Sequence, residues 1–550
     1  MTLKRIGTSE LVSHYHQKTK HYPNRPANSL GYMDWQNQPI PFRSYPAATQ
    51  IQLPVYEITD SPLEQQPYTS LYQQNCENIA AISFANIATM LSLSMGLSAW
   101  KKYVNSEWAL RVNPSSGNLH PTECYLILPS FTDRPACLTH YHPYIHVLEE
   151  LGGFDHAQTQ SLTKLGGFGL ILTSIPWREA WKYGERAYRY CQHDLGHALA
   201  AVRIACNLNG WIMSIIPQVN EQTLDRFLDI QAFNGEEETA DCLCWISIAE
   251  IDTVQVAQWF EHQKMHHYKH APNQLSSEHQ DWAIINQVQQ AVHLANSCEK
   301  PPENTPPTND LSTNYLAIKH TPINNTDIVN SAQEIIFNRR SAQSYDQVKS
   351  QMRVEDFMHS LSCTLPSNTC PFDVFPYQAQ VHLAIFVHAI NGLAPGLYLL
   401  LRNAQHLQQL KNECDQRFLW QEIDTQLPLY LLEKGNFRQI AQEISCNQEI
   451  ASESAFSLGM IAQFKDVISK QPQQYPRLFW ETGLIGQVLY LQAEAFNLRG
   501  TGIGCFFDDQ MHQLLGLQNN KWQSLYHFTI GKAREDIRIE TKAPYYHLQR

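Results

Sequence analysis

The sequence predicts an α+β fold in which two halves of the chain repeat one architecture. Long apolar segments of helical length alternate with short β-branched runs, such as CYLIL at 124–128 and YHFTIG at 526–531. The regular strand–helix–strand order of a doubly wound α/β domain is missing, so helices and strands should form separate layers. A chain of 550 residues also exceeds what one hydrophobic core usually organises, which predicts two large domains.

The clearest repeat joins two long apolar segments, at 193–211 and 480–502. Each begins with an acidic residue, one further residue and a glycine, at Asp194 to Gly196 and at Glu481 to Gly483. Each ends in Asn-Leu-x-Gly, where the glycine suits a helix C-cap. We therefore expect a buried helix at the same place in each half.

A second repeat aligns PSSGNLHPTECYLIL at 114–128 with PYQAQVHLAIFVHAI at 376–390. The prolines coincide, His120 meets His382, and a β-rich run follows in both copies. The small polar residues of the first copy are replaced in the second by tyrosine, glutamine and alanine. The scaffold recurs while its small hydrogen-bonding residues do not, and this asymmetry calls for a functional explanation.

A stretch rich in proline, asparagine and threonine near the middle of the chain predicts a linker. It runs from about Ser297 to Asn325 and lacks apolar periodicity. The predicted organisation is an N-terminal extension at 1–60, a first domain at 61–270, a linker at 271–325 and a second domain at 326–550.

The composition argues against several classes of protein. A formal net charge of −12 disfavours nucleic-acid binding, because neutralising phosphates needs a basic face. No apolar run approaches the roughly 18 to 20 residues of a membrane helix, and the first residues lack the apolar core of a secretory signal. The 13 cysteines are scattered without a C-x-x-C pair, which is typical of reduced thiols. We expect a cytoplasmic protein without nucleic-acid or membrane partners.

Two short motifs suggest ligand sites that their context disfavours. GTGIG at 500–504 follows a predicted helix, whereas a dinucleotide-binding fingerprint follows a strand, so we do not expect a dinucleotide site. A glycine turn can still let the backbone approach a flat ring or a phosphate. HDLGH at 193–197 has the histidine spacing of zinc peptidases, but Asp stands where Glu belongs and no third ligand is evident. A core or interface role is the preferred interpretation, and no metal is expected.

Two cationic motifs allow a binding role. Arg339 and Arg340, followed by Ser341, supply planar donors and a hydroxyl that suit phosphate binding. The alternative is that the two arginines lie on a solvated surface. The stretch WKYGERAYRY at 181–190 would place Lys182, Arg186 and Arg189 on neighbouring faces of a helix. It is either a charged aromatic interface or the lining for an anionic or proton-accepting group.

Four motifs in this order resemble the nitroreductase-like flavoproteins, specifically their SagB-type dehydrogenase branch. They are RVNPSSGNLHP, KYGERAYRY, NRRSAQSYD and LIGQVLYLQAEAFNLRGTGIG. The segments YHQKTKH at 15–21 and MDWQNQPIPFRSYP at 33–46 resemble the leading part of that branch. The resemblance covers most of the chain as two tandem copies. It implies an α+β fold of two tandem nitroreductase-like domains that form an intramolecular pseudo-dimer.

The resemblance also implies an FMN site shared between the two halves. In that family one subunit supplies an Arg-Arg-Ser segment and a glycine turn, and its partner supplies a Pro-Ser-Ser loop. The first half lacks the arginines and the second half lacks the loop, so one composite site and one FMN per chain are expected. The implied cofactor-binding residues are Arg339, Arg340, Ser341, Gly502, Ile503 and Gly504 from the second half, with Pro114, Ser115, Ser116, Gly117 and Asn118 from the first.

The function implied by the resemblance is that of an FMN-dependent oxidoreductase. Lys182 and Tyr183 match a pair implicated in proton abstraction in the azoline-oxidising members. The substrate would be a peptide azoline, or a small electron acceptor reduced with NAD(P)H. Because one of two sites is degraded, a flavin-binding or flavin-free pseudoenzyme that acts as a partner protein is the alternative. The protein would be a monomeric pseudo-dimer or a homodimer.

Overall fold

The computed structural model describes residues 7–55, 65–73, 78–132, 134–230, 235–262, 265–297, 328–423 and 427–548. Most of the predicted proline-rich linker lies outside these residues. Helices and antiparallel sheets occupy separate layers in both halves, which confirms the predicted α+β class. The predicted boundaries of extension, domains and linker stay predictions.

Two large antiparallel sheets have the same strand order. In the first half, β5, β4, β7, β9 and β8 are neighbours in that order, and in the second half so are β14, β12, β17, β19 and β18. The first sheet consists of β1 (Thr49–Gln52), β6 (Val147–Gly153), β5 (Cys137–His142), β4 (Thr122–Leu128), β7 (Phe168–Ser174), β9 (Thr239–Ser247) and β8 (Ile212–Ile215), with β10 (His266–His267) beside β6. The second consists of β15 (Gln421–Glu422), β16 (Leu429–Lys434), β14 (Gly396–Leu400), β12 (Val381–Val387), β17 (Phe456–Gln463), β19 (Trp522–Gly531) and β18 (Arg499–Ile503).

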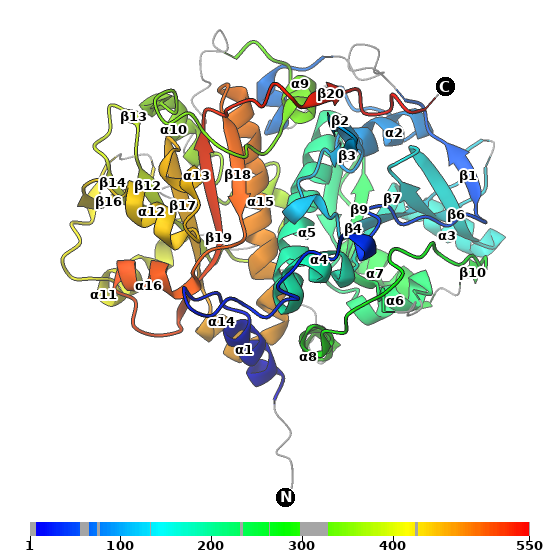
Figure 1. Ribbon diagram of the computed structural model, residues 1–550. Coiled ribbons are helices and arrows are strands. Elements are labelled where there is room, and N and C mark those ends of the chain that lie inside the picture. The colour runs from blue at the N-terminus through cyan, green and yellow to red at the C-terminus, as the bar shows by residue number, and fades with distance from the viewer. Residues whose placement is uncertain are drawn as a thin grey trace, which may run out of the picture.

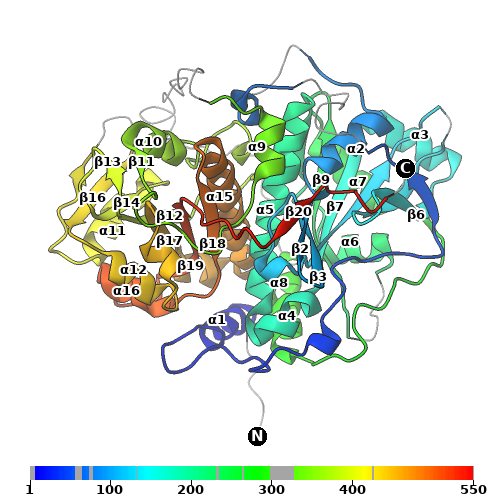
Figure 2. The ribbon, with the colours of Figure 1, turned by 45° about the horizontal axis from the view of Figure 1, so that its top comes forward.

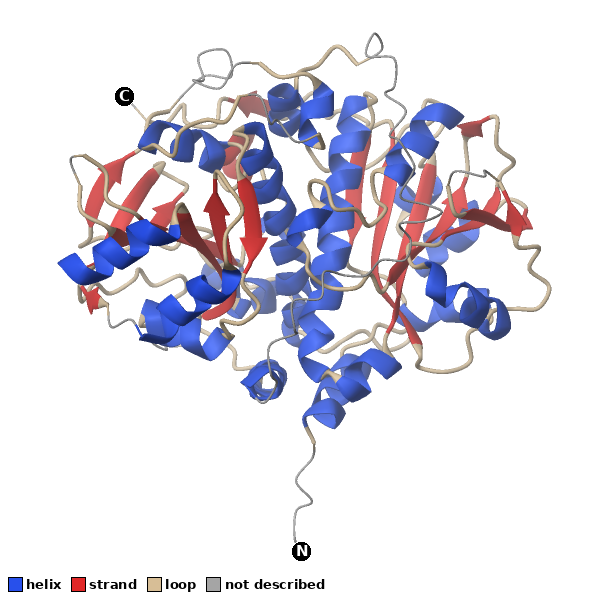
Figure 3. Cartoon of the chain, turned by 180° about the vertical axis from the view of Figure 1, so that it is seen from behind, coloured by secondary structure: helices blue, strands red, loops and turns tan. Residues whose placement is uncertain are grey.

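Helices lie between and around the two sheets (Figure 3). In the first half they are α1 (Thr8–Lys18), α2 (Phe84–Ser92), α3 (His156–Leu165), α4 (Pro176–Tyr183), α5 (Ala187–Leu208), α6 (Glu221–Leu228), α7 (Thr253–His262) and α8 (Ala283–Ser297). The others are α9 (Ala332–Asn338), α10 (Val354–Ser362), α11 (Leu407–Glu413), α12 (Arg438–Ile444), α13 (Glu449–Ser452), α14 (Lys465–Lys470), α15 (Tyr475–Ala495) and α16 (Asp508–Leu515). Two small sheets comprise β2 (Leu97–Tyr103), β3 (Ser106–Arg111) and β20 (Glu540–Lys542), and β11 (Met352–Arg353) with β13 (Ile390–Asn391).

Helices α5 and α15 form the centre of the molecule, and the two sheets flank them (Figure 1). Every residue of both helices is buried. They cross at the two glycines that the sequence repeat pairs. A Cβ atom built on Gly196 would lie 2.9 Å from the Cα of Gly483 and 2.8 Å from the Cα of Trp480. Because real Cβ contacts are longer than this, only glycine permits so close a crossing.

Both ends of the chain cross to the opposite half. Helix α1 packs against α14, and its His16 lies 3.2 Å from the hydroxyl of Tyr475. The C-terminal strand β20 pairs with β2 of the first half, with Trp100 opposite Lys542 (Figure 2). These exchanged arms add contacts between the two halves beside the crossing of the central helices.

Helix α8 falls within the range predicted as linker, yet it packs in the interface. It contacts α1, and its Asn296 donates to Glu221 over 2.7 Å. Arg477 in turn donates to Asn296 over 3.3 Å, so α8 bridges the halves.

The predicted continuous helix at 181–190 is wrong, because Gly184 interrupts it. Gly184 has a φ of +54°, and a Cβ atom there would lie 2.6 Å from the Cα of Ser29. Helix α4 therefore ends at Tyr183, and α5 begins at Ala187. Consequently Lys182 does not share neighbouring helix faces with Arg186 and Arg189.

The crossing of α5 and α15 generates a first prediction. Gly196→Ala should lower the free energy of unfolding by roughly 1–3 kcal/mol, because the new methyl group meets main-chain atoms that cannot move aside without separating the helices. Urea unfolding of the purified chain measures the change. Gly7→Ala is the matched control, since nothing lies within 4 Å of a Cβ atom at that position. Equal stabilities of both variants would contradict the proposed tight crossing.

Candidate functional site

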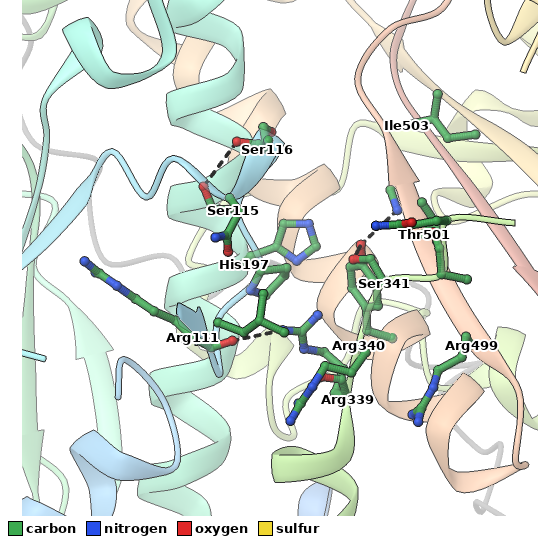
Figure 4. A pocket seen from close by; sticks show the side chains of 18 of the residues that line it. Arg111, Ser115, Ser116, His197, Arg339, Arg340, Ser341, Arg499, Thr501 and Ile503 are labelled. Carbon is green, nitrogen blue, oxygen red and sulfur yellow. Dashed lines mark hydrogen bonds between the residues drawn. The ribbon is translucent and has the colours of Figure 1, made fainter. Parts of the chain in front are cut away.

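A pocket of about 730 Å³ lies between the two halves and is lined by both (Figure 4). This volume is within the range of ordinary small-molecule and cofactor sites, about 300–1,000 Å³. All eleven cofactor-binding residues implied by the sequence line it, together with Tyr183. Residues that lie more than 380 positions apart in the sequence, such as Pro114 and Gly502, thus meet around one cavity.

The first wall is the loop at 114–118, which α5 anchors. Residues 116–118 form a short 3-10 turn, and Gly117 and Asn118 have φ values of +60° and +59°. The carboxylate of Asp194 accepts hydrogen bonds from the Ser116 backbone N–H (3.1 Å) and hydroxyl (3.0 Å). The Ser115 hydroxyl accepts from the backbone N–H of His120 over 2.8 Å. The acid of the repeated Asp-x-Gly motif therefore holds the predicted binding loop in place.

The second half uses the same device at the matching position. The backbone N–H of Gln380 donates to Glu481 over 3.0 Å, and Arg402 pairs with the same carboxylate. Both acids of the sequence repeat thus anchor the loop that precedes the central strand of each sheet. This common anchor explains why the scaffold recurs although the loop residues differ.

The cationic end of the pocket comes from the residues that follow α9. This helix begins with a reciprocal capping box between Ser331 and Glu334 and ends at Asn338. Arg339 donates to the main-chain oxygens of Val112 (3.1 Å) and Arg111 (3.0 Å). Arg340 donates to the oxygens of Phe337, Arg339 and Ser98. Neither guanidinium forms an ion pair with a carboxylate in the described ranges.

Burial disfavours the charge on these arginines. Desolvation lowers the pKa of Arg339 to about 10 and that of Arg340 to about 9. Burial also lowers the pKa of Lys101, and the nearby charges of Arg340 and Arg499 oppose its protonation. A bound anion would compensate this cluster, because it restores the favourable interaction that water no longer supplies. The cationic end therefore suits a phosphate group.

Strand β18 forms the third wall, so the predicted glycine turn at 500–504 is wrong. Residues up to Ile503 pair with β19, with Gly502 opposite Phe528. The Gly502 N–H donates to the Tyr490 hydroxyl over 2.9 Å, and that hydroxyl lies 2.8 Å from the Ser341 hydroxyl. A Cβ atom at Gly502 would collide with the Tyr526 ring, at 2.7 Å from its Cζ. The glycines thus allow aromatic rings to pack directly against the strand.

The motif HDLGH supplies part of the pocket floor rather than a metal site. His197 lies 3.2 Å from the Tyr526 hydroxyl, and burial lowers its pKa to about 3. His193 stacks on the Tyr526 ring at 4.2 Å between centroids. Among the described residues no group of three or more His, Cys, Asp or Glu side chains could hold a metal ion. The neutral imidazole of His197 therefore offers a hydrogen bond without a charge.

Lys182 and Tyr183 lie at the C-terminal end of α4, beside Gly117. The Tyr183 ring stacks on Tyr190 at 4.1 Å between centroids, and the Lys182 ammonium lies 5.2 Å from the centroid of the Tyr183 ring. A Cβ atom on Gly117 would be 2.9 Å from the Tyr183 hydroxyl. Burial raises the pKa of Tyr183 well above 10, and the carboxyl of Glu179 adds to this effect. Its phenol consequently keeps its proton at neutral pH and is available as a hydrogen-bond donor.

Arg186 and Arg189 do not line the pocket, contrary to the grouping that the sequence suggested. Both are buried and bind the carboxylate of Asp508, at 2.9 Å and 2.7 Å. Asp508 also accepts from the backbone N–H of His21 over 2.8 Å. This cluster ties α5 to α16 and to the N-terminal segment, so its role is structural.

The matching location on the other side of the interface carries different residues. Tyr377, which stands where the first half has Ser115, lies under the Arg477 guanidinium at 4.5 Å from its ring centroid. Arg477 is held in turn by Asn296 of α8. Strand β8, at the position of β18, reads IMSI and contains no glycine. The second half therefore carries a large aromatic side chain where the first half has Ser115, and β8 lacks the glycines of β18.

Several pocket residues are not among the site residues that the sequence predicts. Tyr490, Tyr526, Lys101 and Arg499 all line the cavity. Tyr490 lies within the repeated apolar helix, where an aromatic residue is indistinguishable from core. Lys101 and Arg499 reach the cavity from β2 and β18, which are brought together only by tertiary structure.

Residues 398–532 match the nitroreductase family. The whole chain is similar to a crystal structure from Anabaena variabilis ATCC 29413 whose protein is provisionally described as a nitroreductase. The TM-score is 0.66 at 21% identity, over 95% of this chain and 99% of that chain. The chain therefore contains a nitroreductase family domain, and its overall fold is that of the Anabaena protein. No curated protein matches the sequence significantly.

Two further solved structures match only in part. The NADPH:FMN oxidoreductase from Vibrio harveyi, complexed with NAD⁺, matches at a TM-score of 0.21 and 14% identity, over 37% of this chain and 68% of that chain. The E. coli microcin synthetase McbBCD complex matches at a TM-score of 0.25 and 15% identity, over 44% and 93%. Matches at these scores carry no further conclusion.

Asp194 generates a prediction on pH dependence. Burial raises its pKa to about 7, whereas an unfolded aspartate titrates near about 3.9. Between these values the folded chain holds a proton that the unfolded chain has lost, so stability falls as pH rises from about 4 to about 7. Between about pH 4 and about pH 7, the free energy of unfolding of the wild type, relative to that of Asp194→Asn, should fall by about 1.4 kcal/mol per pH unit.

Urea unfolding at several pH values measures this difference. The exposed Asp281→Asn variant is the control, and its curve should run parallel to that of the wild type. Parallel curves for Asp194→Asn as well would contradict the buried titration.

Proposed function

We propose that this chain is an FMN-dependent oxidoreductase of the nitroreductase and SagB-type dehydrogenase kind, with one composite flavin site per chain. Two tandem nitroreductase-like domains, related by the shared strand order, would form its intramolecular pseudo-dimer. The observation that carries the proposal is the pocket itself, because one half supplies the anchored Ser115–Ser116 loop and the other supplies Arg339 and Arg340. The family match at 398–532 supports the same class.

The residues present fit FMN. Arg339 is buried and Arg340 is half-buried, and the hydrogen bonds that they donate in the described ranges go to main-chain oxygens, so both would be available to a phosphate group. The Ser341 hydroxyl would add a donor. Tyr526 and Tyr190 pack directly against Gly502 and Gly504, and all four residues line the cavity, so a flat ring would lie beside these aromatic side chains.

FMN, when bound, would supply the transfer of a hydride or electrons, and the chain would position the reactants and protons. The stacked Tyr183 phenol, with its raised pKa, would donate a proton or a hydrogen bond to a substrate at the pocket mouth. Its raised pKa disfavours the role of base that the family resemblance implies. Lys182, exposed beside it, remains the candidate for that role.

The substrate is proposed to be a peptide azoline or a small electron acceptor, the latter with NAD(P)H as donor. The internal pairing of two halves makes a monomer sufficient, although a homodimer is compatible with it. We propose a cytoplasmic location without nucleic-acid or membrane partners. No helix in the described ranges is long and apolar enough to cross a membrane.

A degenerate pseudoenzyme that serves as a partner protein is the second candidate. The second half favours this candidate because it has Tyr377, beneath Arg477, in place of the small loop residue Ser115. The two candidates differ in what the purified protein does. In an enzyme, the electron donor bleaches the bound flavin and an electron acceptor restores its colour. A pseudoenzyme lacks flavin, or its flavin is not reduced and reoxidised in this way.

The first test of the proposal is flavin stoichiometry. The purified full-length protein should be yellow and release one FMN per chain, measured by flavin absorbance against quantitative amino-acid analysis. Arg340→Ala should weaken FMN binding roughly 10- to 100-fold, as expected for the loss of a charged hydrogen bond of about 1.5–3 kcal/mol.

Arg417→Ala is the matched control, because this exposed arginine pairs with Asp415 on the surface. Its FMN affinity should equal that of the wild type. Two FMN per chain, or full affinity in Arg340→Ala, would overturn the composite site.

The second test addresses Tyr183. In Tyr183→Phe, FMN content and bleaching by NADPH under anaerobic conditions should be unchanged. Recolouring by a nitroaromatic acceptor should slow by roughly 10²- to 10⁴-fold, because the proton donor is missing. The exposed Tyr32→Phe serves as control. Equal recolouring rates in all three proteins would exclude Tyr183 as the donor.

A further inference from the structure

Two cysteine thiols meet at the edge of the pocket. The Sγ atoms of Cys446 and Cys505 lie 2.9 Å apart, although the residues are 59 positions apart in the sequence. A bonded disulfide measures about 2.05 Å, so closure requires an approach of less than about 1 Å. Cys505 itself lines the cavity.

This pair differs from the other described cysteines in its accessibility. Cys505 is exposed and Cys446 is half-buried, whereas the other nine free cysteines in the described ranges are buried. Burial raises the pKa of many of those thiols, for example Cys363 and Cys414 to about 12. Reagents in solution should therefore reach this pair selectively.

Hydrogen bonds between two loops hold the sulfurs together. Cys446 and Asn447 have φ values of +54° and +60°, which makes a tight turn between α12 and α13. Gln448 donates from its side chain to the main-chain oxygens of Cys505 (2.9 Å) and Ser445 (2.8 Å). The Phe507 backbone N–H also donates to the Ile444 oxygen over 2.8 Å, so a main-chain bond joins the two segments as well.

The two thiols have different acidities. The hydrogen bond with Cys446 lowers the pKa of Cys505 to about 7, and the charge of Arg186 adds to this effect. The same hydrogen bond and burial raise the pKa of Cys446. Asp508, which pairs with Arg186, opposes the ionisation of Cys505, so the hydrogen bond is the decisive contribution. Cys505, the more exposed and more acidic thiol, is therefore suited to act as the nucleophile, and Cys446 is suited to act as the resolving thiol.

We propose that Cys446 and Cys505 form a redox-active dithiol that reduces low-molecular-weight disulfides by thiol–disulfide exchange. The Cys505 thiolate attacks one sulfur of a disulfide RS–SR, forms a mixed disulfide and releases one thiolate, RS⁻. Cys446 then loses its proton and attacks the Sγ atom of Cys505, which closes the internal disulfide and releases the second RS⁻. Two protein thiols are oxidised and one disulfide is reduced, so two electrons are transferred. This activity goes beyond the proposed function and does not require FMN.

Oxidised glutathione is the probe that tests the proposal. The full chain is reduced, freed of reductant, incubated with graded mixtures of oxidised and reduced glutathione, and alkylated. We expect the wild type to lose two reactive thiols together, to release two glutathione molecules and to yield one linked peptide pair containing Cys446 and Cys505. Reduced glutathione in excess should reverse the reaction.

Variants separate the two roles. Cys446→Ala should stop at one glutathionyl group on Cys505, and Cys505→Ala should stay largely unreacted. The half-maximal pH for alkylating Cys505 should rise from near 7 toward about 8.5 in Cys446→Ala, since the hydrogen bond is lost. Cys414→Ser, which removes a buried thiol, should behave as wild type.

Three results would overturn the proposal. One is a wild type that accumulates the mixed disulfide without closing the internal bond. Another is an alkylation pH profile that does not change in Cys446→Ala. The third is oxidation that reaches the buried cysteines at the same glutathione ratio. The wild-type peptide map decides the question even if a variant fails to fold, and flavin content plays no part in it.

Discussion

The close crossing of α5 and α15 is the constraint on which the rest of the structure depends. Because Gly196 and Gly483 carry no side chains, the two buried helices touch main chain to main chain. Asp194 and Glu481 stand two residues before these glycines, so the crossing sets the position of both acids. Each acid holds the loop that leads into the central strand of its sheet. One steric contact thereby determines how two sheets and two loops face each other.

The pocket is a consequence of that arrangement and of its broken symmetry. On one side, the small Ser115 lines the cavity together with Arg339 and Arg340. On the other, Tyr377 stands at the position of Ser115 and lies under the Arg477 guanidinium. The two halves therefore keep the same scaffold for stability but differ in the residues that face the interface. The exchanged arms, α1 and β20, add contacts that a loose pair of domains would lack.

Much of the candidate site could be predicted from the sequence, because its key residues form short contiguous motifs. The loop at 114–118 and the arginines at 339–340 were both recognisable, and the structure brings them to one cavity. Tyr490 and Tyr526 could not be identified in the same way, since an aromatic residue within an apolar segment looks like core. The pairing of Cys446 with Cys505 was also invisible, because no local spacing joins residues 59 positions apart.

The sequence by itself determined the α+β class, the repeat of the apolar helices and the division of cavity residues between the halves. These features depend on the order of apolar, polar and glycine residues within short segments, which the sequence contains directly. Tertiary structure alone decided that residues 499–503 form a strand, since pairing with β19 supplies its hydrogen bonds. It also decided that Arg186 and Arg189 bind Asp508 instead of facing the pocket. Buried charges take whichever partner the fold brings near, and that partner lies 319 or more residues away.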